Sequence, residues 1–168
     1  MTLQEKTTIT AYHGSNSANI ETLTPSARGS FGPGIYFADT LSSAKAYGPE
    51  ILKARFILSN PWIVSADYES KLAIEEDFDS PSVDAILSLL GGRALLDDAR
   101  QTDGLYDERL QALLIEAGYD GIIATYRKDN CKEYVVFSES SFTNELERLS
   151  KSSGWVKINK TKTNGHTI

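Results

Sequence analysis

The segment TPSARGSFGPG at residues 24–34 restricts the fold more than any other feature, because it holds three glycines and two prolines in eleven residues. Glycine and proline at this density interrupt both helices and strands. One regular element must therefore end before this segment, and another must begin after it. The flanking runs TTITAYHGS (7–15) and GIYFA (34–38) are rich in alternating or continuous apolar residues, which is typical of short strands.

Short strands and short helices are mixed along the rest of the chain. Four further runs predict strands, namely ILKARFIL (51–58), DGIIATY (120–126), EYVVF (133–137) and GWVKI (154–158). Five runs predict helices, namely SANIETL (17–23), LSSAKAYG (41–48), SVDAILSLL (82–90), YDERLQALLIEAGY (106–119) and SFTNELERL (141–149). The fourth helix would place Leu110, Leu113, Leu114 and Ala117 on one face. The strands do not follow a βαβ rhythm, so the fold class is α+β.

The length of 168 residues suits a single domain. We expect that domain to cover residues 1–158, with a polar tail at 159–168. Residues 67–120 contain fourteen Asp or Glu against four Lys or Arg. We expect an acidic helical insertion at about 67–117 that is a solvated decoration of the core. The alternative is a surface for a basic protein partner.

Several functions are excluded or disfavoured by composition. Cys131 is the single cysteine, and with two histidines it leaves neither an internal disulfide nor a Cys/His zinc site, so no metal is expected. No apolar run reaches the roughly 20 residues of a membrane span. The polar start MTLQEKTTIT is not a secretory signal, so we expect a cytoplasmic protein, of the producing cell or of a target cell. The net charge of −6 disfavours non-specific nucleic-acid binding.

Familiar catalytic motifs are also missing. The sequence contains no G-x-x-x-x-G-K-[ST] phosphate loop and no G-x-S-x-G nucleophile elbow. Its GSFGPG does not match G-x-G-x-x-G, and it precedes a strand where a dinucleotide loop would follow one. A nucleophilic pair of Cys131 with His13 is conceivable but weakly supported, since single Cys and His residues are common.

Four short blocks make sense as a set, although each of their residues alone has an ordinary structural explanation. They are YHGS (12–15), FGPGIYFADT (31–40), SSAKAYG (42–48) and EYVVF (133–137). Together, and in this order, they resemble the ADP-ribosyltransferases of the His-Tyr-Glu class, the group that includes diphtheria toxin and the poly(ADP-ribose) polymerases. The run GYDGII (118–123) is similar to the small transferase domains of phage and plasmid polyvalent proteins.

The resemblance implies a split, twisted β-sandwich that holds NAD, the co-substrate, in the cleft between its sheets. It implies three catalytic residues, Glu133, His13 and Tyr36. Breakage of the nicotinamide–ribose bond passes through an oxocarbenium-like state, and a carboxylate beside that ribose stabilises the developing charge. Glu133 would fill this role and would orient or deprotonate the acceptor.

The resemblance also implies a set of NAD-binding residues, namely His13, Gly14, Ser15, Arg28, Tyr36 and Tyr47. The two tyrosines would sandwich the nicotinamide ring, Gly14 would hold its amide through the backbone, and His13 would bind a ribose hydroxyl. Arg28 is the candidate for the pyrophosphate, against the alternative of an exposed loop arginine. One departure is Ala44, which stands where many polymerase-type members have a serine that binds the nicotinamide amide. Either Ser42 or Ser43 replaces it through a shift in register, or the bond to the nicotinamide amide is absent.

These residues imply an NAD-dependent mono-ADP-ribosyltransferase that acts on a macromolecule, with protein favoured over nucleic acid as acceptor. The polar loop 126–132, which holds three cations, falls where the family contacts its acceptor. The resemblance indicates a bacterial or phage toxin, effector or modifier of host machinery. The alternatives are an NAD glycohydrolase, a transferase acting on nucleic acid, and an NAD-binding module without turnover.

Overall fold

The computed structural model describes residues 8–27, 29–66, 108–138 and 146–158. These ranges contain eight strands: β1 (Thr8–Ser15), β2 (Ile35–Ala38), β3 (Glu50–Ile57), β4 (Pro61–Ala66), β5 (Gly121–Tyr126), β6 (Lys132–Val136), β7 (Glu147–Ser150) and β8 (Gly154–Lys157). The helices are α1 (Leu41–Lys45) and α4 (Glu108–Glu116). The expected helix at 82–90, most of the acidic insertion and the polar tail lie outside the described residues.

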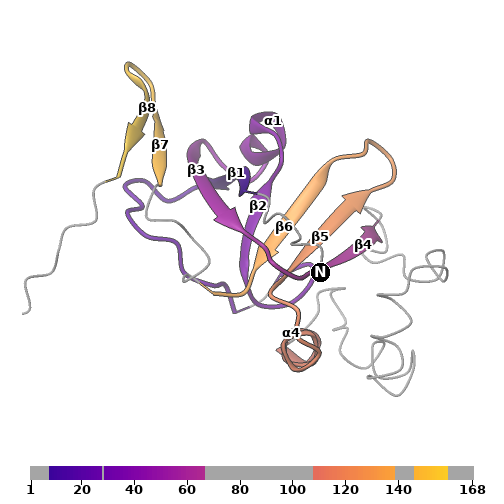
Figure 1. Ribbon diagram of the computed structural model, residues 1–168. Helices are drawn as coiled ribbons and strands as arrows, with labels where there is room; N and C mark the ends of the chain where they lie inside the picture. Colours follow the sequence, from indigo (N-terminus) through magenta and orange to yellow (C-terminus); the bar gives the residue numbers. More distant parts are fainter. Residues whose placement is uncertain (1–7, 28, 67–107, 139–145, 159–168) are drawn as a thin grey trace, which may run out of the picture.

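The strands form one mixed sheet in the order β4-β5-β6-β2-β1-β3-β7-β8. Strands β4 and β5 are parallel, and the other neighbours are antiparallel. The described part of the chain is therefore mostly β-sheet with few helices, and Figure 1 shows α1 above the sheet and α4 below it. The β1–β2 junction is the narrowest in the sheet, because its register consists of the single pair Tyr12 and Ala38. Neither helix in the described ranges is long and apolar enough to cross a membrane.

Two large apolar clusters pack on the sheet. The first joins α4 to one face of β4, β5 and β6, and consists of Phe31, Trp62, Val64, Leu110, Leu114, Ile122, Ala124, Tyr126 and Val135. The second draws residues from β1, β2, β3 and β6, and includes Ala11, Ile35, Phe37, Leu52, Ala54, Phe56 and Val136. Because alternate residues of a strand point to opposite faces, β6 contributes Val135 to the first cluster and Val136 to the second.

Helix α4 forms where the apolar spacing predicts it. Leu110 and Leu114 are fully buried, and Leu113 packs against the same cluster. The helix ends before Gly118, whose φ of +91° favours glycine over any residue with a side chain. The backbone N–H of Tyr119 donates to the carbonyl of Leu114, which closes the last turn.

The connection from α4 to β5 explains the GYDGII motif. Both carboxylate oxygens of Asp120 accept backbone N–H groups from the β3–β4 turn, Ser59 at 2.6 Å and Asn60 at 3.0 Å. A Cβ added at Gly121 would lie 2.7 Å from the Val135 carbonyl oxygen. The motif therefore fixes β5 between β4 and β6 and holds the sheet together on the α4 side.

The described residues of the glycine-rich segment, 24–27 and 29–34, form no helix or regular strand, as expected. Two isolated bridges hold its backbone, one between Ser26 and Gly34 and one between Ser30 and Gly32. Between them Phe31 is fully buried in the first cluster. The segment is thus anchored to the core by one aromatic side chain.

Two expectations about elements are wrong, and one strand was not expected. Residues 17–23 form no helix, since Asn19 has a φ of +60° that interrupts any helical run. Residues 147–149, the end of the helix expected at 141–149, belong to β7, because this strand pairs with β3 on one side and β8 on the other. Such pairing outweighs weak local helix propensity. Strand β4 was not expected at all, although Pro61 at its first position and the run WIV after it are compatible with a strand.

Candidate functional site

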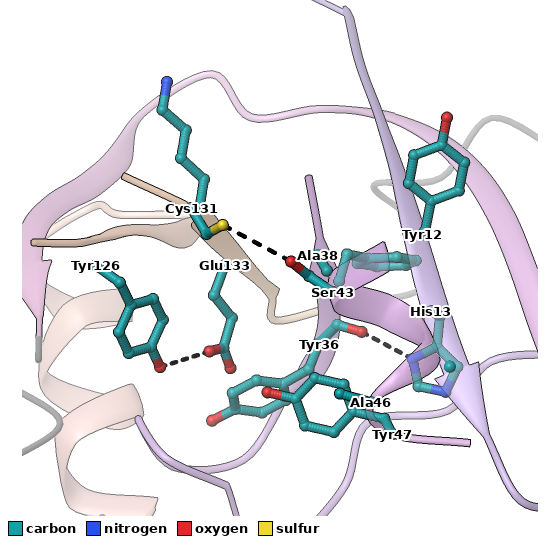
Figure 2. Close-up of a pocket in the computed structure, with 13 residues that line it drawn as sticks. Tyr12, His13, Tyr36, Ala38, Ser43, Ala46, Tyr47, Tyr126, Cys131 and Glu133 are labelled. Atoms are coloured by element: carbon teal, nitrogen blue, oxygen red, sulfur yellow. Dashed lines mark hydrogen bonds between the residues drawn. The ribbon is translucent and has the colours of Figure 1, made fainter. Parts of the chain in front are cut away.

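A cavity of about 250 Å³ opens beside the β1–β2 junction. Its walls come from β1, β2, α1 with the turn after it, and the β5–β6 hairpin (Figure 2). The lining residues are Tyr12, His13, Gly14, Tyr36, Phe37, Ala38, Ser43, Ala46, Tyr47, Tyr126, Cys131, Lys132 and Glu133. Segments more than a hundred residues apart in the chain meet here, including the predicted His13, Gly14, Tyr36, Tyr47 and Glu133.

Glu133 is the buried charged side chain of the described residues, at 8% exposure. Its position on β6 lies opposite Ala38 of β2 and Ala124 of β5. Side chains directly opposite one another on neighbouring strands share a face, so the two alanines leave room around the carboxylate. Its Oε2 accepts a hydrogen bond of 2.7 Å from the Tyr126 hydroxyl. A buried carboxylate needs such a donor, because unpaired burial of a charge is costly.

Tyr36 links the cavity to the glycine-rich segment. Its hydroxyl accepts the backbone N–H of Phe31 at 2.9 Å and donates to the Gly32 carbonyl at 2.5 Å. The ring lies against Gly29, where an added Cβ would come within 2.3 Å of the tyrosine ring. Burial raises the pKa of Tyr36 far above its usual value, against the lowering effect of the Phe31 N–H, and the charge of Glu133 raises it further. The hydroxyl is therefore neutral and able to donate at physiological pH.

His13 is oriented by the backbone of the neighbouring strand. Its Nδ1 lies 2.7 Å from the carbonyl oxygen of Tyr36, as Figure 2 shows. A carbonyl oxygen only accepts, so Nδ1 carries the proton in this bond. In the neutral imidazole Nε2 is then a hydrogen-bond acceptor. The ring also meets Phe37 edge-on, with centroids 6.0 Å apart.

Tyr47 follows α1 and is 62% exposed although it lines the cavity. Partial desolvation raises its pKa, and the negative charge of Glu133 adds to the rise. The charge of Tyr47 in turn raises the pKa of Tyr36. The two tyrosine hydroxyls and the carboxylate therefore lie close enough to interact electrostatically, and Tyr47 has the more exposed ring.

Helix α1 carries the two candidate serines, Ser42 and Ser43, and places one of them at the cavity. Ala44 is fully buried and Ser42 is exposed, whereas Ser43 lines the cavity. The Ser43 hydroxyl accepts from Thr40, the N-cap of α1, and donates to Cys131 Sγ at 3.7 Å. Of the two candidate replacements for the missing serine, Ser43 is the one placed at the cavity.

Gly14 has a packing reason to be glycine. A Cβ at this position would lie 1.9 Å from the Ala44 carbonyl oxygen and 3.3 Å from the Cβ of Tyr47. A contact below 3.0 Å to backbone cannot be relieved by a side-chain rotation. The absence of a side chain therefore lets α1 approach β1, which brings Ser43 and Tyr47 to the cavity wall.

One predicted NAD-binding residue, Ser15, is not found at the cavity, and another, Arg28, cannot be compared with it. Ser15 is not among the described residues that line the cavity, and its Oγ accepts the backbone N–H of Ser17. Arg28 lies outside the described residues. Of the three cations in loop 126–132, Lys132 lines the cavity. In the ranges that the structure describes, no group of three or more His, Cys, Asp or Glu side chains is placed to hold a metal ion.

The sequence assigned no individual role to Tyr12 or Tyr126, and Cys131 was considered only as a nucleophile paired with His13; all three also line the cavity. The register of the β5–β6 hairpin is the feature that places Tyr126 beside Glu133. The N–H of Tyr126 donates to the Cys131 carbonyl, and Ala124 lies opposite Glu133. This register makes Tyr126 and Glu133 diagonal neighbours on one face, but it is visible only when the turn residues are known.

The comparisons with known proteins define the class of this chain as ADP-ribosyltransferase. A family model described as ADP-ribosyltransferase in polyvalent proteins matches residues 5–143. This range contains β1 to β6 and every cavity residue named above. The chain belongs to this family, the ADP-ribosyltransferases in polyvalent proteins.

Two further comparisons add little. No curated protein matches the chain. Among solved structures, the crystal structure of an anti-CRISPR protein is similar with a TM-score of 0.44 and 18% sequence identity, over 84% of this chain and 95% of that chain. Nothing about substrate or partner follows from a likeness at this level.

Proposed function

We propose that this domain is an NAD-dependent mono-ADP-ribosyltransferase of the His-Tyr-Glu class. It would transfer one ADP-ribose unit from NAD to a macromolecular acceptor and release nicotinamide. The observation that supports this proposal most strongly is the convergence of His13, Tyr36, Tyr47 and Glu133 on one cavity, in a chain of an ADP-ribosyltransferase family. These four residues come from β1, β2, the turn after α1, and β6.

The cavity suits one half of NAD. Pockets for drug-sized ligands usually enclose roughly 300–1,000 Å³, and this cavity holds about 250 Å³. That space suits the nicotinamide and its ribose, with the adenosine half lying outside it. Tyr36 and Tyr47 provide aromatic rings for the nicotinamide, and Nε2 of His13 provides an acceptor for a ribose hydroxyl.

The reaction proceeds by breaking the bond between the nicotinamide nitrogen and ribose C1. Nicotinamide leaves with the bonding electron pair as a neutral molecule, and positive charge develops on the ribose. The Glu133 carboxylate stabilises this charge in a largely dry site, where one fixed charge has most effect. The acceptor nucleophile then forms a bond to C1, and Glu133 orients it or accepts its proton.

We assign the fold to a split β-sandwich with the two halves β4-β5-β6-β2 and β1-β3-β7-β8. The β1–β2 junction, whose register consists of one residue pair, supports this division. The cavity lies beside the junction, where the two halves would form a cleft. In this proposal residues 1–158 act as one domain.

For the acceptor we propose a protein, in the cytoplasm of the producing cell or of a target cell. The net charge of −6 disfavours a nucleic-acid backbone as partner. The β5–β6 hairpin tip, residues 127–130, is exposed beside the cavity and offers a surface for the acceptor. The role that fits a small transferase domain of this family is a bacterial or phage toxin, effector or modifier.

The test uses NAD labelled in its adenine half. The purified protein is incubated with labelled NAD and bacterial lysate, beside a Glu133→Gln control, and macromolecules are separated from free label. We expect label on discrete proteins that is resistant to nuclease and absent from the control. Nuclease-sensitive label would make nucleic acid the acceptor. Nicotinamide release without any macromolecular label would indicate a glycohydrolase, and neither release nor label would overturn the transferase assignment.

A further inference from the structure

Tyr126 and Glu133 form a buried pair at the base of the β5–β6 hairpin. The Tyr126 hydroxyl donates to Glu133 Oε2 at 2.7 Å, and Figure 2 shows the two groups pointing toward each other. Tyr126 is 5% exposed and Glu133 is 8% exposed. A hydrogen bond from a neutral hydroxyl to a carboxylate is charge-assisted, and it is stronger than one between neutral groups.

Tyr126 is fixed by one packing contact and two backbone hydrogen bonds. Its ring belongs to the first apolar cluster. Its backbone N–H donates to Cys131, and its carbonyl accepts the N–H of Asn130. Asn130 adopts a φ of +58°, which turns the chain back toward β6. A donor fixed by packing and by the hairpin backbone can hold a carboxylate in one orientation, which a mobile donor cannot do.

The two residues that lie directly opposite Glu133 on the neighbouring strands are small. The residues directly opposite on β2 and β5 are Ala38 and Ala124, which are too short to press on a glutamate side chain. The hydroxyl of Tyr126, the diagonal neighbour, therefore supplies orientation that the alanines do not.

We propose that Tyr126 is a positioning residue for Glu133, which holds the carboxylate in the orientation that faces the reacting ribose. This inference rests on the proposed function, in which Glu133 is the catalytic carboxylate. Because Tyr126 also begins the hairpin turn that carries residues 127–130, it connects the acceptor side of the cavity to the catalytic group. Tyr126 does not itself touch the reacting atoms in this account.

The test is Tyr126→Phe, which keeps the ring in the core and removes only the oxygen. The matched control is Tyr119→Phe, since Tyr119 packs against the same cluster but does not line the cavity. We expect Tyr126→Phe to lower kcat for nicotinamide release about tenfold or more, with KM for NAD changed less than about twofold, because a displaced catalytic group affects the transition state more than binding. Tyr119→Phe should keep both constants.

A double-mutant cycle with Glu133→Gln tests the connection directly. If Tyr126 acts through Glu133, adding Tyr126→Phe to Glu133→Gln should lower kcat less than about twofold further. If Tyr126→Phe lowers kcat by the same factor in the wild-type protein and in Glu133→Gln, the positioning role is overturned. A wild-type kcat in Tyr126→Phe would also overturn it. If the wild-type protein binds NAD but releases no nicotinamide, the proposed function fails, and the positioning role fails with it. Activity in the wild type with no effect of Tyr126→Phe rejects the positioning role alone.

A second measurement leaves Tyr126 unchanged, and so does not depend on whether the phenylalanine variant folds. In protein labelled with ¹³C at the tyrosine Cζ, the Tyr126 resonance should move in Glu133→Gln, because the hydroxyl then faces an amide oxygen or nitrogen. The Tyr119 resonance should stay in place. An unmoved Tyr126 resonance would show that the hydrogen bond is not formed in solution and would overturn the proposal.

Discussion

The imidazole of His13 on β1 donates its Nδ1 proton to the carbonyl oxygen of Tyr36 on β2, at 2.7 Å. These two strands share a single register pair, Tyr12 with Ala38. The side-chain bond thus connects the strands beside that pair, from the residue after Tyr12 to the residue two positions before Ala38. It also fixes the tautomer of the ring, so that in the neutral form Nε2 accepts.

The first prediction concerns this histidine. His13→Ala should weaken NAD binding about tenfold, the loss of roughly one hydrogen bond to a ribose hydroxyl. Isothermal titration of NAD measures the change. His13→Asn keeps a short donor near the Tyr36 carbonyl but has no group at the place of Nε2, and it should weaken binding by a similar factor. Wild-type affinity in both variants would remove His13 from the NAD site.

The second prediction separates the ring of Tyr36 from its hydroxyl. Tyr36→Phe should lower the free energy of unfolding by about 1–3 kcal/mol, because the Phe31 N–H and the Gly32 carbonyl lose their partner. Hydrogen exchange at the Phe31 amide should become faster, while exchange at the amides of α4 should follow only the global change in stability. Unchanged protection of the Phe31 amide would show that the hydroxyl does not hold the glycine-rich segment.

The third prediction tests the contact between β1 and α1. Gly14→Ala should lower the free energy of unfolding by about 1–3 kcal/mol, because its Cβ would meet the Ala44 carbonyl oxygen at 1.9 Å. Ser42→Ala, a change at an exposed position of α1, should leave the free energy of unfolding within about 0.5 kcal/mol of the wild-type value. Urea unfolding measures both variants. Equal stability of the two would mean that α1 does not approach Gly14 as closely as described.

The fourth prediction concerns alkaline pH. The folded state raises the pKa of Tyr36, chiefly by burial, whereas an unfolded tyrosine titrates near 10. The folded state therefore retains a proton that the unfolded state releases, so the stability from this group is complete below about pH 10 and is lost as the pH rises beyond it. Urea unfolding between about pH 8 and 11 should show a smaller decline for Tyr36→Phe than for the wild type. An equal decline in the free energy of unfolding of the two proteins would contradict the burial of Tyr36.

Much of the fold could be predicted from the sequence because several elements have strong local signals. The apolar spacing of α4 and the glycine at its end predicted a helix over 106–119, and the described residues form it at Glu108–Glu116. The alternating runs likewise predicted β1, β3, β5 and β6. Strand β7 could not be predicted in this way, since its pairing with β3 and β8 is a tertiary effect on a locally helical sequence. Strand β4 was overlooked, although its β-branched residues were a usable signal.

The candidate site was predictable to the extent that its residues belong to recognisable blocks. His13, Tyr36, Tyr47 and Glu133 were selected by their motifs, and the structure brings them to one cavity. Tyr126 was not assigned a role, because its contact with Glu133 depends on the hairpin register rather than on any motif. The reason for glycine at position 14 was also incomplete, since only the folded chain reveals the approach of α1.

Glu133→Gln is the most direct test of the account, because it replaces the carboxylate with an amide of nearly the same shape. Nicotinamide release and transfer of labelled ADP-ribose should both fall by at least about a hundredfold, the scale of one lost catalytic group. The Kd for NAD, measured by titration on the same sample, should stay within about threefold of the wild type. Near-normal transfer by Glu133→Gln, with NAD still bound, would contradict the assignment of Glu133 as the catalytic carboxylate.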